Sequence, residues 1–466
     1  MAINYLDPKH RQTLSDIQGN ILKSHGREHT ANLFIEGRLG EEKEVKNWLN
    51  SLVNEGIIKS GYEQLYATHL WKTQRIDGGL FACIHISRLG YDYLFDPLIT
   101  EDKFLGKSAF LNGMEQAGLD DPDKAKWGEG YQQNIHFHLL IGDNEKNKVE
   151  QLAAKIKNEV ESFATVHHIE FGDAIKNREG AGLEHFGYVD GISQPLFFED
   201  EIQKYRDAHG ESGKLKFDPT ADLKLVLTPD PFFTTAQGSF FVFRKLEQNV
   251  QGFKKAEEKL ADNLHLKGDE RERVGAMIMG RFEDGTPIQM SEHEGLIANS
   301  SFNNFDYSED EQSKCPYHAH IRKTNPRSDI SDSKSAIMAR RGIPFGERLD
   351  DMDDGIAETK PLGGVGLLFQ SYQASIEAQF ERIQKQWAND KSFPKNALGI
   401  NDGNDVGLDL IIGQKIGQDG YPSESSYFKK WGDKNSEVRM TFDQFVTMKG
   451  GEYFFAPSIP FLKTLK

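Results

Sequence analysis

The sequence predicts a duplicated α+β fold, in which sheets are covered by helices. Apolar runs bounded by Gly, Asp or Asn are typical of strands. Runs of this kind lie at 30–39, 78–90 and 134–142. Residues 147–164 then carry apolar side chains at spacings of three and four, which predicts a helix. Strand and helix follow one another again at 238–264 and 364–387, so the two parts of the chain share one order of elements.

Between these elements the sequence is more polar. Residues 199–222 form a polar segment between the two parts, and residues 262–335 are rich in Asp, Glu, Asn, Ser and Lys. We expect long surface loops in the second of these regions.

Composition excludes several classes of protein. The 466 residues are enough for about two or three domains, or for one large duplicated unit that encloses a cofactor. Acidic residues outnumber basic ones by 72 to 56, and no basic block is interleaved with aromatics, which argues against nucleic acid or an anionic membrane as partner. The N-terminus does not read as a secretory signal, and no run approaches the roughly 18 apolar residues of a membrane span. We therefore expect a soluble, cytoplasmic protein.

The chain has two cysteines, Cys83 and Cys315. This number excludes a disulfide framework, a four-cysteine zinc site and a covalent CxxCH haem attachment. Any haem would have to be held noncovalently.

One carboxylate stands out in the stretch EHFGYVDGISQP (184–195). Asp190 lies in an Asp-Gly pair, which is a strong turn signal because glycine adopts positive φ and aspartate bonds its own backbone. Taken alone, the stretch predicts a turn.

Two pairs of histidines are separated by one residue. His318 and His320 lie in CPYHAHIRKTNPR (315–327), and on an extended segment they would share one face, which suits metal ligation. His136 and His138 have the same spacing, and there we favour hydrogen-bonded imidazoles on a half-exposed strand.

Cations follow both the histidines and a later turn. Arg322, Lys323 and Arg327 come directly after His320 and suit carboxylate or phosphate groups of a bound molecule. The arginine pair in IMARRGIPFGER (337–348) is by itself typical of a solvated surface. GLLFQSYQ (366–373) reads as a core strand that can also line a pocket.

Taken in order, these segments resemble the dye-decolorizing peroxidase family. Its GxxDG motif matches Gly187, Tyr188, Val189, Asp190 and Gly191. The motif is followed in the family's order by the histidine in AHIRKTNPR (319–327), by RRGIPFG (340–346) and by GLLFQSYQ (366–373). Three more segments resemble the longer, non-secreted bacterial members, so the resemblance covers nearly the whole chain. They are DIQGNIL (16–22), GSFFVFRKLEQNVQGF (238–253) and MGRFEDGTPI (279–288).

The resemblance implies an α+β fold of two ferredoxin-like domains, with antiparallel sheets and peripheral helices, related to a dimeric α/β barrel. The domains would span 1–222, which ends with the GxxDG motif, and 223–466, which would hold one noncovalent b-type haem. In this family a histidine binds the iron, and an aspartate and an arginine lie on the other side of the haem. These positions match His320, preferred over His318, then Asp190, and Arg340 with Arg341 as the alternative.

Further residues follow from the resemblance or from proximity. Glu377 is the expected carboxylate partner of His320, although some relatives carry an aspartate nearer the position of Ser375. Leu367 and Phe369 match apolar residues that restrict the pocket to small oxidants. The remaining residues expected along the haem or its access channel are Ile192, Ser193, Gln194, Arg322 and Asn325.

The implied reaction is reduction of hydrogen peroxide with oxidation of aromatic compounds such as dyes and phenols. Asp190 would move a proton from one peroxide oxygen to the other, and Arg340 would stabilise the negative charge that develops. Large reductants could not enter the pocket, so electron transfer from a surface Trp387, Tyr372 or Trp431 is expected for them.

Two alternatives differ in class. A noncatalytic haem-binding or haem-delivery protein could use the same fold, but it would not need the Asp190 and Arg340 pair. A metal hydrolase built on the His-x-His pairs would need additional carboxylate ligands. A homodimer is compatible with the sequence, although no motif calls for one.

Overall fold

The structure is a computed structural model that describes residues 2–210, 215–295, 302–352, 354–418 and 424–466. In its first half four antiparallel strands lie side by side in the order β2-β3-β1-β4. They are β1 (His29–Gly37), β2 (Phe81–Ser87), β3 (Phe137–Asp143) and β4 (Ala164–Asp173). Helices α2 (Glu42–Asn54) and α3 (Gly61–Gln74) connect β1 to β2, and α7 (Lys146–Val160) connects β3 to β4. This order of elements is that of a ferredoxin-like unit.

The second half repeats the arrangement. Its strands follow the order β10-β11-β8-β14, and all neighbouring pairs are antiparallel. They are β8 (Phe233–Gln248), β10 (Ile343–Phe345), β11 (Gly366–Gln373) and β14 (Val446–Ala456). Helix α9 (Val250–Leu264) follows β8, and the π-helix η9 (Ile376–Ala388) follows β11. The prediction of two ferredoxin-like units is therefore confirmed, while the boundary at residue 222 stays a prediction.

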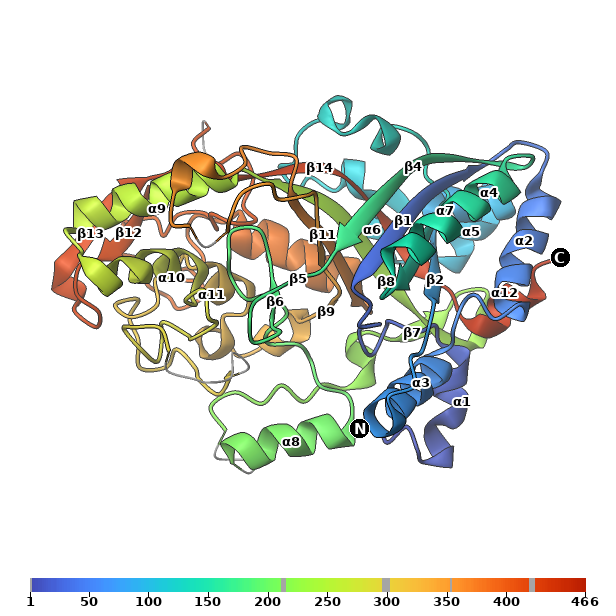
Figure 1. Ribbon diagram of the computed structural model, residues 1–466, viewed down its shortest axis with the longest axis horizontal. Helices are drawn as coiled ribbons and strands as arrows, with labels where there is room; N and C mark the ends of the chain where they lie inside the picture. Colours follow the sequence, from blue (N-terminus) through green and yellow to red (C-terminus); the bar gives the residue numbers. More distant parts are fainter. Residues whose placement is uncertain (1, 211–214, 296–301, 353, 419–423) are drawn as a thin grey trace.

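The two units share one sheet (Figure 1). Strand β14 pairs with β2 of the first unit, where Phe454 lies opposite Ser87 and Phe455 opposite Ile86. At the other end β10 packs on β4, so closely that a Cβ on Gly172 would lie 2.6 Å from Ile343. The short strands β7 (Thr228–Asp230) and β9 (Ala339–Arg340) pair beside β8 and β11. The sheet thus curves toward closure around an interior, as in a barrel.

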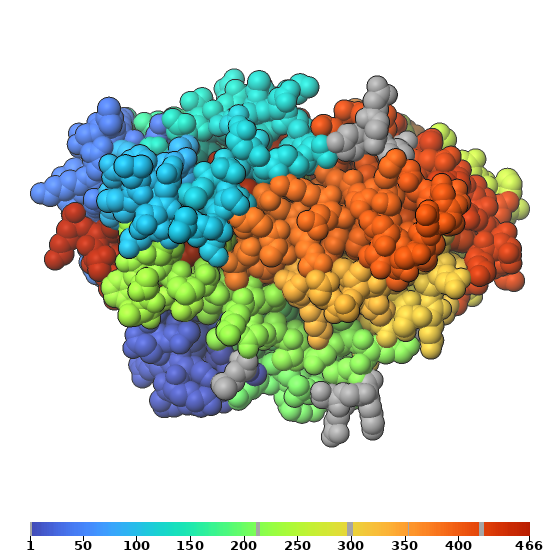
Figure 2. Space-filling view, turned by 180° about the vertical axis from the view of Figure 1, so that it is seen from behind, coloured from blue at the N-terminus to red at the C-terminus, as the bar shows by residue number. Residues whose placement is uncertain are grey.

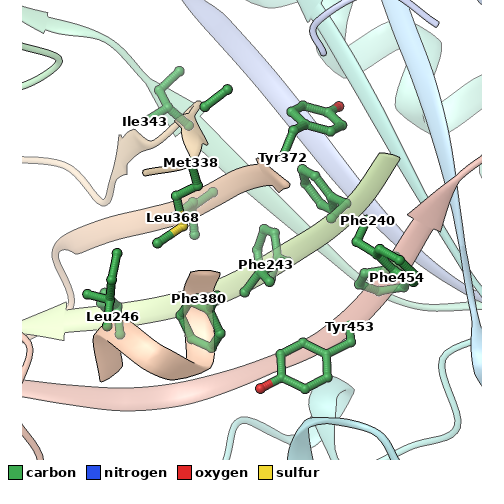
Figure 3. Packing of buried hydrophobic residues seen from close by; sticks show 14 of the residues in the cluster. Phe240, Phe243, Leu246, Met338, Ile343, Leu368, Tyr372, Phe380, Tyr453 and Phe454 are labelled. Atoms are coloured by element: carbon green, nitrogen blue, oxygen red, sulfur yellow. The ribbon is translucent and has the colours of Figure 1, made fainter. Parts of the chain in front are cut away.

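Aromatic side chains fill both faces of β8 (Figure 3). Successive residues of a strand point to opposite faces. Phe241 and Phe243 face the barrel interior, where their rings lie near His138. Phe240 packs on the other face against Phe110 and Phe455. Burial of these rings excludes water from the inside of the barrel.

The remaining α-helices and strands lie outside the ten-stranded sheet. They are α1 (Pro8–Asp16), α4 (Arg88–Leu94), α5 (Pro97–Lys103), α6 (Ser108–Asn112), β5 (Ile175–Lys176), β6 (Gly182–Leu183), α8 (Glu199–His209), α10 (Arg273–Met279), α11 (His320–Thr324), β12 (Glu424–Phe428), β13 (Glu437–Thr441) and α12 (Ile459–Thr464). On the back of the molecule the segment around α5 and α6, in light blue, lies against the orange segment that contains η9 (Figure 2).

One expectation about local structure needs correction. The strand predicted at 78–90 ends at Ser87, because the Ser87 hydroxyl accepts a hydrogen bond from the Gly90 N–H and starts α4. The region 262–335 also contains α10, every residue of which is buried. The polar segment 199–222 contains α8.

Candidate functional site

A cavity of about 550 Å³ lies in the second half, between β8, β11, η9 and the segment 184–196. Its volume is within the range of roughly 300–1,000 Å³ found for ligand and cofactor sites. Apolar side chains form most of the wall. They include Leu246, Met279, Ile321, Met338, Leu367, Phe369, Phe380, Ile383 and Ile411.

His320 is the first residue of α11, and its ring lines the cavity. Its Nδ1 lies 2.9 Å from Oδ2 of Asp409, and because a carboxylate only accepts, Nδ1 donates. Nε2 has no hydrogen-bond partner among the described residues. When the ring is neutral, this hydrogen bond leaves Nε2 as the unprotonated nitrogen, which is the tautomer that a metal ion requires.

Asp409 is fully buried. Its other oxygen, Oδ1, accepts from the N–H groups of Ile411 (2.8 Å) and Ile412 (3.2 Å). Burial would raise the pKa of Asp409, but the contact with His320 and these hydrogen bonds lower it overall. Asp409 is thus the carboxylate partner of His320, a role that the sequence did not indicate.

The expectation for Glu377 is corrected by this contact. Glu377 lies near the start of η9, and its Oε1 accepts from the Ala109 N–H (2.7 Å) and the Ser108 hydroxyl (3.3 Å) at the start of α6. Its side chain is not part of the cavity wall and does not contact His320.

The two histidines of the 315–327 segment do not share a face. The chain is a turn up to Ala319 and a helix from His320, so the extended geometry that would align them is absent. His318 is buried, with Nε2 at 3.0 Å from the carbonyl of Ser426, and does not line the cavity. Only His320 of this pair reaches it.

The same helix corrects the expectation for Arg322. Two residues along a helix correspond to a rotation of about 200°, so Arg322 points away from the face that carries His320. It is fully buried and forms ion pairs with Asp310 (2.9 Å) and Asp329 (2.8 Å). Asn325, at the end of α11, does line the cavity.

Asp190 lies between the hydrogen-bonded turn at 185–187 and a bend at Gly191, and its N–H donates to the Gly182 carbonyl at 2.9 Å. Gly187 and Gly191 on either side have φ of 102° and 81°, which favour glycine. The Asp190 carboxylate accepts from the Gly191 N–H at 2.6 Å and lines the cavity. Its Oδ1 lies 3.7 Å from Nη1 of Arg340. The backbone around Asp190 therefore directs the carboxylate toward the cavity and the arginine.

Arg340 lies on β9 and is held by the segment that follows Asp190. Its guanidinium donates to the carbonyl of Ile192 at 2.5 Å. The amide of Gln194 accepts from the Arg340 N–H (3.1 Å) and donates to the Arg340 carbonyl (3.2 Å). Arg341 also borders the cavity, but its guanidinium donates to the carbonyls of Asn20, Ile21 and Arg340. Arg340 is therefore the arginine of the pair that faces Asp190.

Glu184 begins the turn that precedes Asp190, and its carbonyl accepts from the Gly187 N–H at 3.0 Å. Its carboxylate accepts from the N–H groups of Phe186 (2.9 Å) and Tyr188 (3.0 Å) and from the side chain of Gln248 (2.5 Å). Burial raises the pKa of Glu184 to about 7, and the charge of Asp190 adds to this, whereas the hydrogen bonds oppose it. Glu184 is the first residue of the stretch 184–195, but its position in the sequence does not indicate a role.

Two buried arginines border the cavity without a carboxylate partner in the described ranges, namely Arg281 and Arg327. Both donate to Oδ1 of Asn303, and their other acceptors are backbone carbonyls and the hydroxyl of Ser193. Burial lowers the pKa of Arg281 to about 9, and the nearby charge of Arg327 adds to this effect. Burial likewise lowers the pKa of Arg327 to about 10. This concentration of buried positive charge suits an anionic ligand.

Leu367 and Phe369 lie two residues apart on β11, and both side chains line the cavity, as expected. The backbone segment from Ile192 to Gln194 also forms part of the wall. Ser193 has a positive φ of 64°, and its hydroxyl donates to Asn303 at 2.6 Å.

The three aromatic residues expected at the surface differ in position. Tyr372 is fully buried inside the barrel, so the expectation of a surface position is wrong. Trp387 is only 3% exposed, but it borders a second, open hollow on the outside of η9 together with Arg382 and Phe393. Trp431 is partly buried, and its indole N–H donates to the carbonyl of Ile288.

Within the described ranges, no group of three or more His, Cys, Asp or Glu side chains is placed to hold a metal ion. The carboxylate ligands that a His-x-His metal hydrolase needs are thus missing from that part of the chain. None of the described helices combines the length and apolar character needed to cross a membrane.

Comparison with known proteins gives a consistent answer. Residues 216–399 match the model of the Dyp-type peroxidase C-terminal family. The chain is 39% identical to the multifunctional dye peroxidase DyP2 of Amycolatopsis sp. over 464 residues, covering 97% of this chain and 96% of that protein. It is 30% identical to a dye-decolorizing peroxidase of Auricularia auricula-judae, covering 76% of this chain and 70% of the relative.

Solved structures agree. The DyP2 structure superposes with a TM-score of 0.89 at 38% identity, covering 100% of this chain and 99% of the other. The DyP-type peroxidase of Anabaena sp. gives a TM-score of 0.88 at 35% identity, covering 100% and 97%. Since identity of this level extends over nearly the whole of both chains, the protein belongs to the Dyp-type peroxidase family and is a haem peroxidase.

Proposed function

We propose that the cavity binds one b-type haem noncovalently, and that the enzyme reduces hydrogen peroxide there and oxidises aromatic compounds, dyes among them. The main supporting observation is the state of His320. Its Nδ1 is committed to Asp409, and its Nε2 is free in the same cavity that holds Asp190 and Arg340.

The residues present fit such a cofactor. Apolar side chains suit the faces of a porphyrin, and Nε2 of His320 suits the iron. Arg281 and Arg327 lack a carboxylate partner in the described ranges, and the two propionates would supply the missing negative charge. Three independent features of the cavity therefore favour the same ligand.

Haem, when bound, supplies the redox centre at which the O–O bond of peroxide is cleaved. Asp190 accepts the proton from the peroxide oxygen that binds first and returns it to the oxygen that leaves as water. The guanidinium of Arg340 stabilises the negative charge that develops between these oxygens. Because Ile192 and Gln194 hold Arg340 through its side chain and its backbone, the cation is already in position when peroxide arrives.

Leu367 and Phe369 limit what can reach this pair, so we propose that bulky reductants react at the hollow beside Trp387. The Trp387 ring stacks on Phe393, with centroids 5.3 Å apart, and the Arg382 guanidinium lies 5.2 Å from its centroid. Ile383, one turn earlier on η9, lines the cavity. The helix thus connects the hollow to the cavity by a short packed path.

Absorption spectra of the full chain reconstituted with haem test the proposal. We expect a Soret band that shifts on addition of hydrogen peroxide and returns when a phenol is added. His320→Ala should lose or loosen the haem. A chain that gains no Soret band on reconstitution would refute haem binding, and a band that peroxide leaves unchanged would refute the proposed reaction.

A further inference from the structure

We infer that Tyr372 and His85 form a buried redox pair that stores one oxidising equivalent behind the wall of the cavity. Tyr372 is fully buried, and its hydroxyl lies 2.8 Å from Nε2 of His85 on β2. This inference rests on the proposed haem and peroxide chemistry for its oxidant, but it concerns residues outside that site.

The contact belongs to a chain of hydrogen bonds across the barrel interior. Nδ1 of His85 lies 2.9 Å from Nδ1 of His138. Nε2 of His138 lies 3.0 Å from Oδ1 of Asn32. The four side chains in this hydrogen-bond network are fully buried, so each polar group depends on its neighbour for a hydrogen-bond partner. They belong to Tyr372, His85, His138 and Asn32.

Asn32, at the end of this hydrogen-bond network, determines which atom is the donor in each hydrogen bond. Asn32 donates through Nδ2 to the carbonyl of Glu170 (3.3 Å), and its Oδ1 accepts from Gln370 (3.2 Å). Because Oδ1 is therefore the acceptor, Nε2 of His138 must carry the proton that it donates there.

Both rings are neutral, since burial lowers the pKa of His138 to about 3 and that of His85 well below its usual range. A neutral imidazole has one protonated nitrogen, so Nδ1 of His138 accepts and Nδ1 of His85 donates. Nε2 of His85 is then an acceptor, and the hydroxyl of Tyr372 donates to it. The phenol thus has a preformed base for its proton.

The position of Tyr372 relative to the cavity suits electron transfer. Phe369 lines the cavity three residues earlier on β11, about 10 Å along the strand, and its side chain points to the opposite face. Arg341, which also borders the cavity, donates its backbone N–H to Gln370 in the same strand at 2.7 Å. Tyr372 therefore lies behind the wall, on the face of β11 opposite to Phe369, and it is fully buried.

The proposed step is balanced. Tyr372 would lose one electron to the peroxide-oxidised cofactor, and its phenolic proton would move to Nε2 of His85, which leaves a neutral tyrosyl radical and an imidazolium. One electron from an aromatic reductant would later reduce the radical, and the proton would return from His85 to the phenol. Since the ring of His85 stacks on Phe241 with centroids 3.8 Å apart, water does not reach the pair. The radical is therefore protected from reaction with solvent.

The Cys83 thiol lies 3.6 Å from the same hydroxyl oxygen. Because that hydroxyl donates to His85, the thiol is the donor in this contact. The phenol oxygen consequently accepts one hydrogen bond and donates another, a geometry that holds it in place before and after oxidation.

Electron paramagnetic resonance of the haem-loaded full chain tests the inference. The sample is frozen shortly after one equivalent of hydrogen peroxide is added without reductant. We expect a tyrosyl signal that narrows when tyrosine is ring-deuterated and that is lost in Tyr372→Phe. Tyr91→Phe is the matched control, because Tyr91 is also fully buried but its hydroxyl has no partner among the described residues. An unchanged signal in Tyr372→Phe would overturn the inference and leave the network a purely structural one.

Two further measurements separate this inference from the proposed function. Photo-oxidised zinc protoporphyrin in place of haem should generate the same Tyr372 signal without peroxide. A signal in that sample, together with a haem spectrum that peroxide leaves unchanged, would mean that the peroxide reaction is wrong and the redox pair correct. Nitrogen-15 NMR of ring-labelled histidine should find His85 protonated at Nδ1 only. Protonation at Nε2 would overturn the inference, because Tyr372 could not then donate to it.

Discussion

His320 and Asp409 form a buried pair in which the imidazole Nδ1–H donates to a carboxylate whose other oxygen accepts two backbone N–H groups. The carboxylate is therefore held by the chain between Asp409 and Ile412 and in turn fixes the ring orientation of His320. Eighty-nine residues separate the two along the sequence.

Replacing Asp409 should change the reduction potential of the haem iron without causing loss of haem. In Asp409→Asn the amide still fills the space, but the negative charge that gives the imidazole its donor strength is lost. We expect the ferric/ferrous reduction potential to rise and peroxidase activity to fall by about 10- to 100-fold. Spectroelectrochemical titration of the haem-loaded variant measures the potential. Glu377→Gln is the matched control, since Glu377 binds α6 instead, and a shift of equal size in both variants would contradict the assignment.

Asp190→Asn tests proton transfer. The variant keeps the size of the side chain but removes the base, so peroxide should react about 10²–10⁴-fold more slowly while the Soret band is retained. Stopped-flow absorption after mixing with peroxide gives this rate. Glu201→Gln provides a comparison, because Glu201 borders the same cavity but is paired with Lys23. Undiminished turnover in Asp190→Asn would rule out its acid-base role.

Glu184 should make folding stability depend on pH. Its folded-state pKa of about 7 is above the ordinary value of 4.5, so the folded state holds a proton that the unfolded state has released. The free energy of unfolding should therefore fall as pH rises from about 4.5 to 7, by on the order of 3 kcal/mol from this group. Urea unfolding of the wild type and Glu184→Gln between pH 5 and 8 isolates the effect as a difference. A difference that does not vary with pH would show that Glu184 titrates normally.

The guanidinium groups of Arg281 and Arg327 should contribute to the affinity for haem. Arg281→Gln removes one buried positive charge, and loss of a charge-assisted hydrogen bond of about 1.5–3 kcal/mol corresponds to a decrease in haem affinity of roughly 10- to 100-fold. The rate of haem transfer to excess apomyoglobin reports this change. Arg271→Gln is the control, because Arg271 forms an ion pair with Asp262 outside the cavity, and equal transfer rates in both variants would contradict the prediction.

Trp387→Phe should separate large from small reductants. The substitution keeps an aromatic ring on Phe393 but raises the oxidation potential of the side chain. Turnover of a bulky anthraquinone dye should decrease, and turnover of a small phenol should not. Steady-state kinetics with both substrates provide the measurement, with Trp431→Phe as control. If the dye and the phenol are affected alike, Trp387 is not a separate entry point for electrons.

Local sequence patterns were sufficient to predict several strands and helices. Family motifs were sufficient to predict two residues of the candidate site. The strands predicted at 30–39 and 134–142 correspond to β1 and β3, and the helix predicted at 147–164 corresponds to α7. These predictions succeed because the spacing of apolar residues reflects which faces of each element are buried. Asp190 and Arg340 followed from the resemblance, and the structure brings them within 3.7 Å.

The site residues that could not be predicted from the sequence are those whose positions depend on tertiary contacts. Arg322 was expected near the cavity because it is close to His320 in sequence, yet helical rotation carries it away, and Arg327 reaches the wall instead. Asp409 has no local pattern that links it to His320. The hydrogen-bond chain through His85 and His138 likewise joins strands from both halves, and it exists only once the barrel has formed.

The segment from Glu184 to Gln194 belongs to the first half of the chain, but it borders a cavity whose other walls come mostly from the second half. The second half alone would leave Arg340 without the amide and carbonyl that hold it. The complete cavity therefore exists only when both halves of the chain have folded together. If haem binds there as proposed, its Soret band should appear during refolding only after the two halves have met.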